Sequence, residues 1–265
     1  MVPVRFVLLF TSFLTLNIPS AVGQPSLGSN QQAIGNESTT VAREVRRTPG
    51  QGRGSNAPEY SQVVTSSIVS VHQLKHSPPG KARNALNKGI KLFRKARFVE
   101  AIPWLGEAVK IDPEYTDAQN DLAAAYLKVG MPDKAIPPLL SAIKSDPHWE
   151  LPYFNLVLAY IHKSEFSKAE DTARQMIGIN PGSPRAGLGL GLALTLGNRF
   201  TPETQAVLTY AESVFPEATL LLGRVLAGRG EIEAARSKIS TYLAGPGSWD
   251  RDIASEWLEL LKRAP

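Results

Sequence analysis

Two histidines, His72 and His76, stand four residues apart, a spacing that would place both imidazoles on one face of a helix as metal ligands. The segment around them is expected to be extended instead, because it is rich in β-branched residues and ends in Pro78 and Pro79. No third ligand stands nearby in the sequence. We therefore predict no metal site and no cofactor.

Nucleophilic catalysis is not supported either, since the chain has no cysteine and no grouping of serine, histidine and acid at a recognisable turn. Gly187, Gly189 and Gly191 suggest a glycine-rich loop, but their spacing matches neither the dinucleotide fingerprint nor the phosphate-binding loop. We expect them to allow close helix packing. The sequence indicates that the protein is not an enzyme, and the alternative is an enzyme or enzyme accessory of unknown chemistry.

Basic residues are densest between residues 81 and 97, which hold seven Lys or Arg and no Asp or Glu. The seven are Lys81, Arg83, Lys88, Lys91, Arg94, Lys95 and Arg97. They form either a solvated terminal helix or a site for an anionic partner such as lipid headgroups or an acidic polymer. The whole chain has 29 Lys and Arg against 24 Asp and Glu, so we expect no binding to nucleic acid.

The elements that would carry these residues repeat every 34 residues, the interval that separates Pro113, Pro147 and Pro181. If each proline is the thirty-second residue of a unit, three units begin at Ala82, Thr116 and Glu150. Small residues then recur at offsets 8 and 20, namely Gly89, Ala123, Val157, Ala101, Ala135 and Ala169. Two antiparallel helices can approach closely where these residues meet, and the proline ends the second helix.

Two further units follow with a weaker pattern. A fourth unit holds Leu190 and Gly191 at first-helix offsets, but its offset 20 is Glu203 and the nearest suitable alanine is Ala206. The pattern returns in a fifth unit that starts at Pro216. The fourth unit is thus two residues short, and we expect a local irregularity there.

The pattern resembles the tetratricopeptide repeat family, whose signature has an aromatic residue or Leu, a Gly or Ala, a Tyr, an Ala and a Pro at these offsets. The resemblance is strongest over residues 82–183. It implies an all-α fold, a right-handed superhelical solenoid of about five stacked antiparallel helix pairs with a C-terminal capping helix. The expected units are 82–115, 116–149, 150–183, a degenerate 184–215, and 216–247, followed by the cap at 248–265.

The capping helix is expected to begin after Ser248 as its N-cap. Its apolar face would pack on the fifth unit, and the residues of that face are Trp249, Ile253, Trp257, Leu260 and Leu261.

In this family the first helices line a concave groove, so the resemblance implies a partner site there. The offsets that face such a groove carry mostly apolar residues in this chain, and we predict that they bind a protein or peptide as an amphipathic helix or extended segment. The predicted groove residues are Leu86, Ile90, Phe93, Leu127, Phe154, Leu158, Ile161, Leu188 and Leu192. The alternative is that the chain's own segment 63–74, or a second copy, covers them.

One well-known family function is not expected. Members that clamp the C-terminal carboxylate of heat-shock chaperones use Lys, Asn and Arg at defined offsets of three successive units. Those offsets hold Leu86, Ile90, Asp121, Leu151 and Asn155 in this chain. The carboxylate clamp is therefore absent.

The N-terminal third differs in composition from the repeats. Residues 1–23 have Arg5, a short apolar run, and small residues at Ala21 and Gly23, which predicts a secretory signal peptide cut before Gln24. We expect a disordered linker over 24–60, an extended docking segment over 61–81, and no transmembrane segment in the mature chain. The hypothesis is a secreted or periplasmic scaffold or adaptor that is not catalytic. The alternative is a module that binds an anionic envelope component through its basic first helix.

Overall fold

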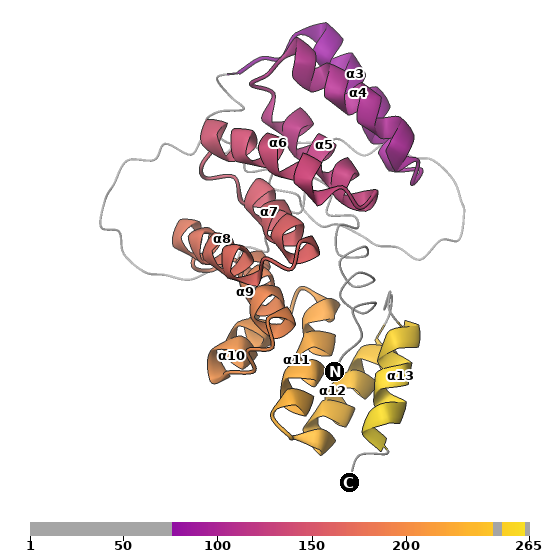
Figure 1. Cartoon of the computed structure of the whole chain (residues 1–265), viewed down its shortest axis with the longest axis vertical. Helices are drawn as coiled ribbons and strands as arrows, with labels where there is room; N and C mark the ends of the chain where they lie inside the picture. The colour runs from indigo at the N-terminus through magenta and orange to yellow at the C-terminus, as the bar shows by residue number, and fades with distance from the viewer. Residues whose placement is uncertain (1–75, 246–250, 263–265) are drawn as a thin grey trace, which may run out of the picture.

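The computed structural model describes residues 76–245 and 251–262, and over these residues the chain forms eleven helices and no strand. The expected signal peptide, linker and nearly all of the docking segment lie outside the described residues. The helices succeed one another along the longest axis of Figure 1, from α3 and α4 at one end to α12 and α13 at the other. They are α3 (Gly80–Phe93), α4 (Phe98–Ile111), α5 (Thr116–Lys128), α6 (Pro132–Ser145), α7 (Glu150–His162), α8 (Phe166–Ile179), α9 (Pro184–Leu196), α10 (Pro202–Ala211), α11 (Pro216–Gly228), α12 (Ile232–Ala244) and α13 (Arg251–Lys262).

Successive helices pack in pairs, α3 on α4, α5 on α6, and so on to α11 on α12. Each pair then packs on the next, because the second helix of one unit contacts the first helix of the following unit. First helices begin at Thr116, Glu150, Pro184 and Pro216, which are the first residues of the units expected from the sequence. The all-α array of stacked helix pairs is confirmed.

Within each pair the helices cross at the small residues. Ala101, Ala135 and Ala169 are completely buried. A Cβ atom built on Gly89 would lie 2.5 Å from Cδ2 of Leu105, closer than packed atoms can approach. Glycine at this offset therefore lets the first helix of unit one approach the second.

A residue with positive φ follows the first helix of every unit. Ala96, Gly130, Ser164, Asn198 and Gly230 have φ between 57° and 81° and stand at the same offset of the five units. This left-handed residue ends the first helix and turns the chain into the second. The five turns are thus built alike, although only two of them use glycine.

The fourth unit departs from the others at its second helix. The α10 helix has 10 residues, compared with 13 or 14 in the other second helices. Thr204 is completely buried, whereas Ala206, the residue expected at the crossing, is not part of the buried core. That expectation is wrong, because the Thr204 hydroxyl donates a hydrogen bond of 2.6 Å to the backbone oxygen of Arg199, and a polar residue so satisfied can be buried.

The last helix, α13, packs on α12 and covers the end of the main hydrophobic core. Ile253, Trp257 and Leu261 contact this core as expected, and the Arg236 guanidinium donates to the backbone oxygen of Leu261. Leu260 was expected on the same face, but it is 58% exposed and Leu258 packs on the core instead. Ser248 and Trp249 lie outside the described residues. None of the helices described is long and apolar enough to cross a membrane.

Candidate partner-binding surface

The structure corrects the expected exposure of the groove residues. Seven of the nine are less than 9% exposed, and only Ile90 and Phe93 are half-buried. The buried residues are Leu86, Leu127, Phe154, Leu158, Ile161, Leu188 and Leu192. Six of these seven belong to the main core, while Leu86 belongs to a smaller core at the first units. Partner binding by any of the nine stays a prediction.

The burial has a cause in how the first helices pack on one another, since α5 contacts α7, α7 contacts α9, and α9 contacts α11. The Phe154 ring lies against α9 where Gly189 leaves room, and a Cβ on that glycine would be 3.5 Å from the ring. One step earlier in the array, Asn155 of α7 donates a hydrogen bond of 2.8 Å to the Asn120 side chain of α5. Side chains at these offsets thus join neighbouring units.

The two predicted groove residues that remain accessible, Ile90 and Phe93, lie in the first unit. Ile90 and Phe93 are half-buried on α3, and Phe98 of α4 meets Phe93 edge-on with ring centroids 5.0 Å apart. The Lys128 amine of α5 stands 5.7 Å from the centroid of the Phe98 ring. Apolar rings and a cation from three helices therefore come together here, an arrangement that can contact both apolar and charged groups of a peptide. We call these four residues the inner patch.

Two ionisable groups in and next to the inner patch have shifted pKa values. Desolvation raises the pKa of Asp121 to about 7, and the neighbouring carboxylate of Asp117 acts in the same direction. Arg94 opposes this shift. Desolvation also lowers the pKa of Lys128 to about 7. Both groups can therefore change charge near neutral pH.

The structure divides the basic residues of the first unit among separate surfaces. All seven are exposed. Arg97 pairs with Glu100 of α4, and Arg94 lies close enough to Asp121 to affect its pKa. Lys88 instead stands over the ring of Trp104, with its Nζ atom 4.3 Å from the centroid. Three of the seven residues therefore have different neighbours, and binding of an anionic partner by the seven stays a prediction.

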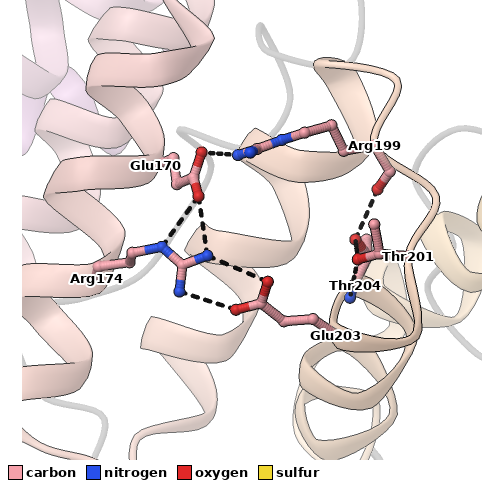
Figure 2. Close-up of polar contacts among 6 residues, drawn as sticks. All are labelled: Glu170, Arg174, Arg199, Thr201, Glu203 and Thr204. Atoms are coloured by element: carbon pink, nitrogen blue, oxygen red, sulfur yellow. Dashed lines mark hydrogen bonds and ion pairs between the residues drawn. The ribbon is translucent and has the colours of Figure 1, made fainter.

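An ion-pair cluster joins units three and four, and sequence reasoning missed it because its members are up to 33 residues apart (Figure 2). Arg174 of α8 donates to Glu170 at 3.0 Å and to Glu203 of α10 at 2.8 Å. Arg199 pairs with the second oxygen of Glu170. Because every charge in the cluster has an opposite partner, we assign it to stability.

A separate shallow depression of about 770 Å³ lies over α10, lined by Gln205, Tyr210 and four neighbouring residues, and no predicted groove residue lines it.

The described residues include no group of three or more His, Asp or Glu side chains placed to hold a metal ion. His76 instead contacts the turn after α4, where its Nε2 atom is 2.7 Å from Oδ2 of Asp112. His72 lies outside the described residues. His76 thus ties the segment before α3 to the first unit.

Comparisons with known proteins agree with this architecture. Residues 92–159 match the family description of the tetratricopeptide repeat. This match supports a relation of the chain to the tetratricopeptide repeat family. The array of helix pairs also resembles a thermophilic tetratricopeptide repeat protein of Thermus thermophilus, with a TM-score of 0.59, 21% identity, and coverage of 68% of this chain and 99% of that one. PilF of Pseudomonas aeruginosa gives a TM-score of 0.55 at 19% identity over 69% and 91% of the two chains.

In sequence, the chain is similar to Hsp70-Hsp90 organizing protein 1 of Glycine max, with 26% identity over 138 residues. The match covers 50% of this chain and 24% of that protein, so this chain spans about a quarter of the relative's length. The structural likenesses, both below 25% identity, establish the fold.

Proposed function

We propose that this protein is an adaptor without catalytic activity that holds a protein partner against the inner patch of its tetratricopeptide array. Tetratricopeptide repeats generally mediate contacts between proteins, and the array supports that class of function. The observation that carries the proposal is the meeting of Ile90, Phe93 and Phe98 with the Lys128 amine at a solvent-accessible part of the inner side. A peptide with an apolar side chain next to a carboxylate matches this chemistry.

The proposed partner is not a chaperone tail bound by a carboxylate clamp, despite the likeness to Hsp70-Hsp90 organizing protein 1. Two of the clamp offsets hold Leu86 and Leu151, which are 4% and 7% exposed and carry no donor. At a third, the Asn155 amide is already bonded to Asn120. The remaining groups cannot surround a carboxylate with donors.

The proposed location is outside the cytoplasm, either secreted or periplasmic. Support comes from residues 1–23, where a short apolar run precedes Ala21 and Gly23. Intact-mass measurement of protein recovered from the envelope or medium tests this. A chain beginning at Gln24 is expected, and one that retains Met1 would contradict the proposal.

A second candidate function is binding of an anionic envelope component by the first unit. The observation that favours it is the charge of the first helix pair, where residues 80–111 carry eight Lys or Arg and two Asp or Glu. This function would use a surface apart from the inner patch, so both can hold in one molecule.

Site-specific photocrosslinking in the producing cell tests the adaptor proposal. A photoreactive amino acid at Phe93 is expected to give a discrete crosslinked partner that mass spectrometry identifies. The same amino acid at Glu233, whose side chain is 83% exposed on α12, serves as the matched control. It is expected not to crosslink that partner. Equal crosslinking from both positions, or none from Phe93, would count against the inner patch.

A further inference from the structure

One face of the first helix is used for stacking in every unit except the first. In units two to five, the residues at offsets 3, 7 and 10 are all buried and apolar, and the first helix of each of these units packs on the preceding second helix. They are Ala118, Leu122, Ala125, Pro152, Leu156, Ala159, Ala186, Leu190, Ala193, Ala218, Leu222 and Val225. This face therefore forms each junction between units.

In α3 the same three offsets hold Asn84, Lys88 and Lys91, and all three are exposed. Lys81 and Lys95 extend the line to either side and are exposed too. Among the described elements, α3 packs on α4 and touches α5, and no helix lies on this face. The four lysines therefore mark an open end of the array, which we call the end face.

The lysines of the end face have no acidic partner among the described residues. None of the four takes part in an ion pair. Elsewhere among the described residues Lys163, Lys168, Lys238 and Lys262 each pair with a carboxylate, whereas Lys110, Lys134 and Lys144 do not. The positive charge of the end face is thus left uncompensated by its surroundings, and an anionic surface would be attracted to it.

An aromatic side chain lies at the border of the end face. The Trp104 ring of α4 is 40% exposed and stands 4.3 Å from the Lys88 amine. A partly exposed tryptophan beside lysines with long apolar stems is typical of groups that enter the headgroup layer of a membrane.

We propose that the end face, formed by Lys81, Lys88, Lys91, Lys95 and Trp104, docks the array onto a membrane surface of anionic phospholipids. This proposal rests on the second candidate function and is independent of the inner patch. The charges are lysines, which act as point charges on flexible stems, whereas arginine is favoured where a bidentate contact selects one carboxylate or phosphate. The 14-residue helix is about 21 Å long and carries Lys81, Lys88 and Lys91 along one side, with Lys95 just beyond its end, as a flat partner requires.

Vesicle sedimentation of the purified full chain tests the proposal. Binding is expected to vesicles that contain phosphatidylglycerol, to be absent with pure phosphatidylcholine, and to fall steeply as salt is added. Lys88→Gln with Lys91→Gln is expected to lower the partition coefficient about tenfold or more. The matched control, Arg83→Gln with Arg94→Gln, removes the same charge from another side of α3. It is expected to change the partition coefficient about threefold or less.

Both double variants must first show wild-type helical content by circular dichroism, which is expected because all four residues are exposed. Brominated lipid should quench tryptophan fluorescence in the wild type, and Trp104→Phe should abolish that quenching. The absence of vesicle binding in low salt, or equal losses in the two double variants, would overturn the assignment of the end face. If the chain binds polyglutamate through the same lysines and ignores vesicles, the second candidate function survives but its partner is an acidic protein and the lipid proposal is wrong.

Discussion

At the junction of units three and four, Arg174 bridges Glu170 and Glu203 (Figure 2). The four lysines of the end face, in contrast, have no ion pair among the described residues. The Glu170 side chain is only 13% exposed and is held between two guanidinium groups. A carboxylate held in a junction has lost part of its water and needs opposite charge. Lysines at the open end keep their water, so their charge remains available for a partner.

Placing a lysine of the end face in a junction between units should have the largest effect on stability. Leu156 and Lys88 occupy the same offset, but Leu156 is 4% exposed within the junction between units two and three. Leu156→Lys is expected to lower the free energy of unfolding by about 4 kcal/mol or more, because it buries an amine without a partner. Urea denaturation followed by circular dichroism measures this.

The reciprocal change, Lys88→Leu, is expected to leave unfolding within about 0.5 kcal/mol of wild type. It should instead promote self-association by giving the open end an apolar face, which sedimentation velocity would detect. Similar destabilisation by the two substitutions would mean that the end face is not free of packing.

The next largest effect concerns the inner side of the array. Phe154 is 1% exposed, so Phe154→Ala should cost about 3 kcal/mol or more in the free energy of unfolding. Phe93→Ala at the half-buried inner patch should cost less, about 1 kcal/mol, and should weaken partner binding. Thermal and urea unfolding of both variants measure the difference. If Phe154→Ala were neutral for stability, its role in joining the units would be wrong.

Stability should also depend on pH through Asp121. Its pKa is raised to about 7 from its ordinary value of 3.8, so the folded state disfavours the charged carboxylate. Relative to Asp121→Asn, the wild type should therefore lose stability progressively as pH rises from about 4 to about 7, and little more above pH 7. Urea titrations at several pH values compare the two proteins. A constant difference across this range would show that Asp121 titrates normally.

The smallest effect is expected at the ion-pair cluster. Glu170→Gln keeps the shape of the side chain but removes its charge, so it should destabilise the array by about 1 kcal/mol at low salt and less at high salt. Lys91→Gln on the end face is the matched control and should change stability by less than about 0.3 kcal/mol, since no partner loses a charge. Equal effects of both substitutions would remove the distinction between paired and unpaired charges.

Much of the fold could be predicted from local residue types. Prolines at a fixed interval end the second helices, and alanine or glycine at the crossings allows the pairs to form, so the first residues of four units were located from sequence. The prediction of Ala206 at the fourth crossing was wrong because residue size alone does not include the hydrogen bond that buries Thr204. The prediction that Leu260 packs on the fifth unit was wrong because Leu258 and Leu260 both fit an apolar helix face, and only packing on the fifth unit separates them.

The candidate site was harder to predict. Offsets alone suggested that Phe154, Leu158 and Leu192 would be exposed, but their exposure depends on how closely the first helices of neighbouring units approach. A glycine such as Gly189 sets that approach from the next unit, 35 residues away along the chain from Phe154. No periodic pattern in a single sequence reports this distance.

The sequence by itself determined the period of the repeat and the excess of basic residues between 81 and 97, because these depend on residue types and their spacing along the chain. The tertiary structure alone decided which residues of the inner side are buried, and which basic side chains lie at the open end beside Trp104 rather than near Asp121. The physical reason is that burial and pairing depend on contacts between helices, and stacking brings together residues that are more than 30 positions apart in the chain.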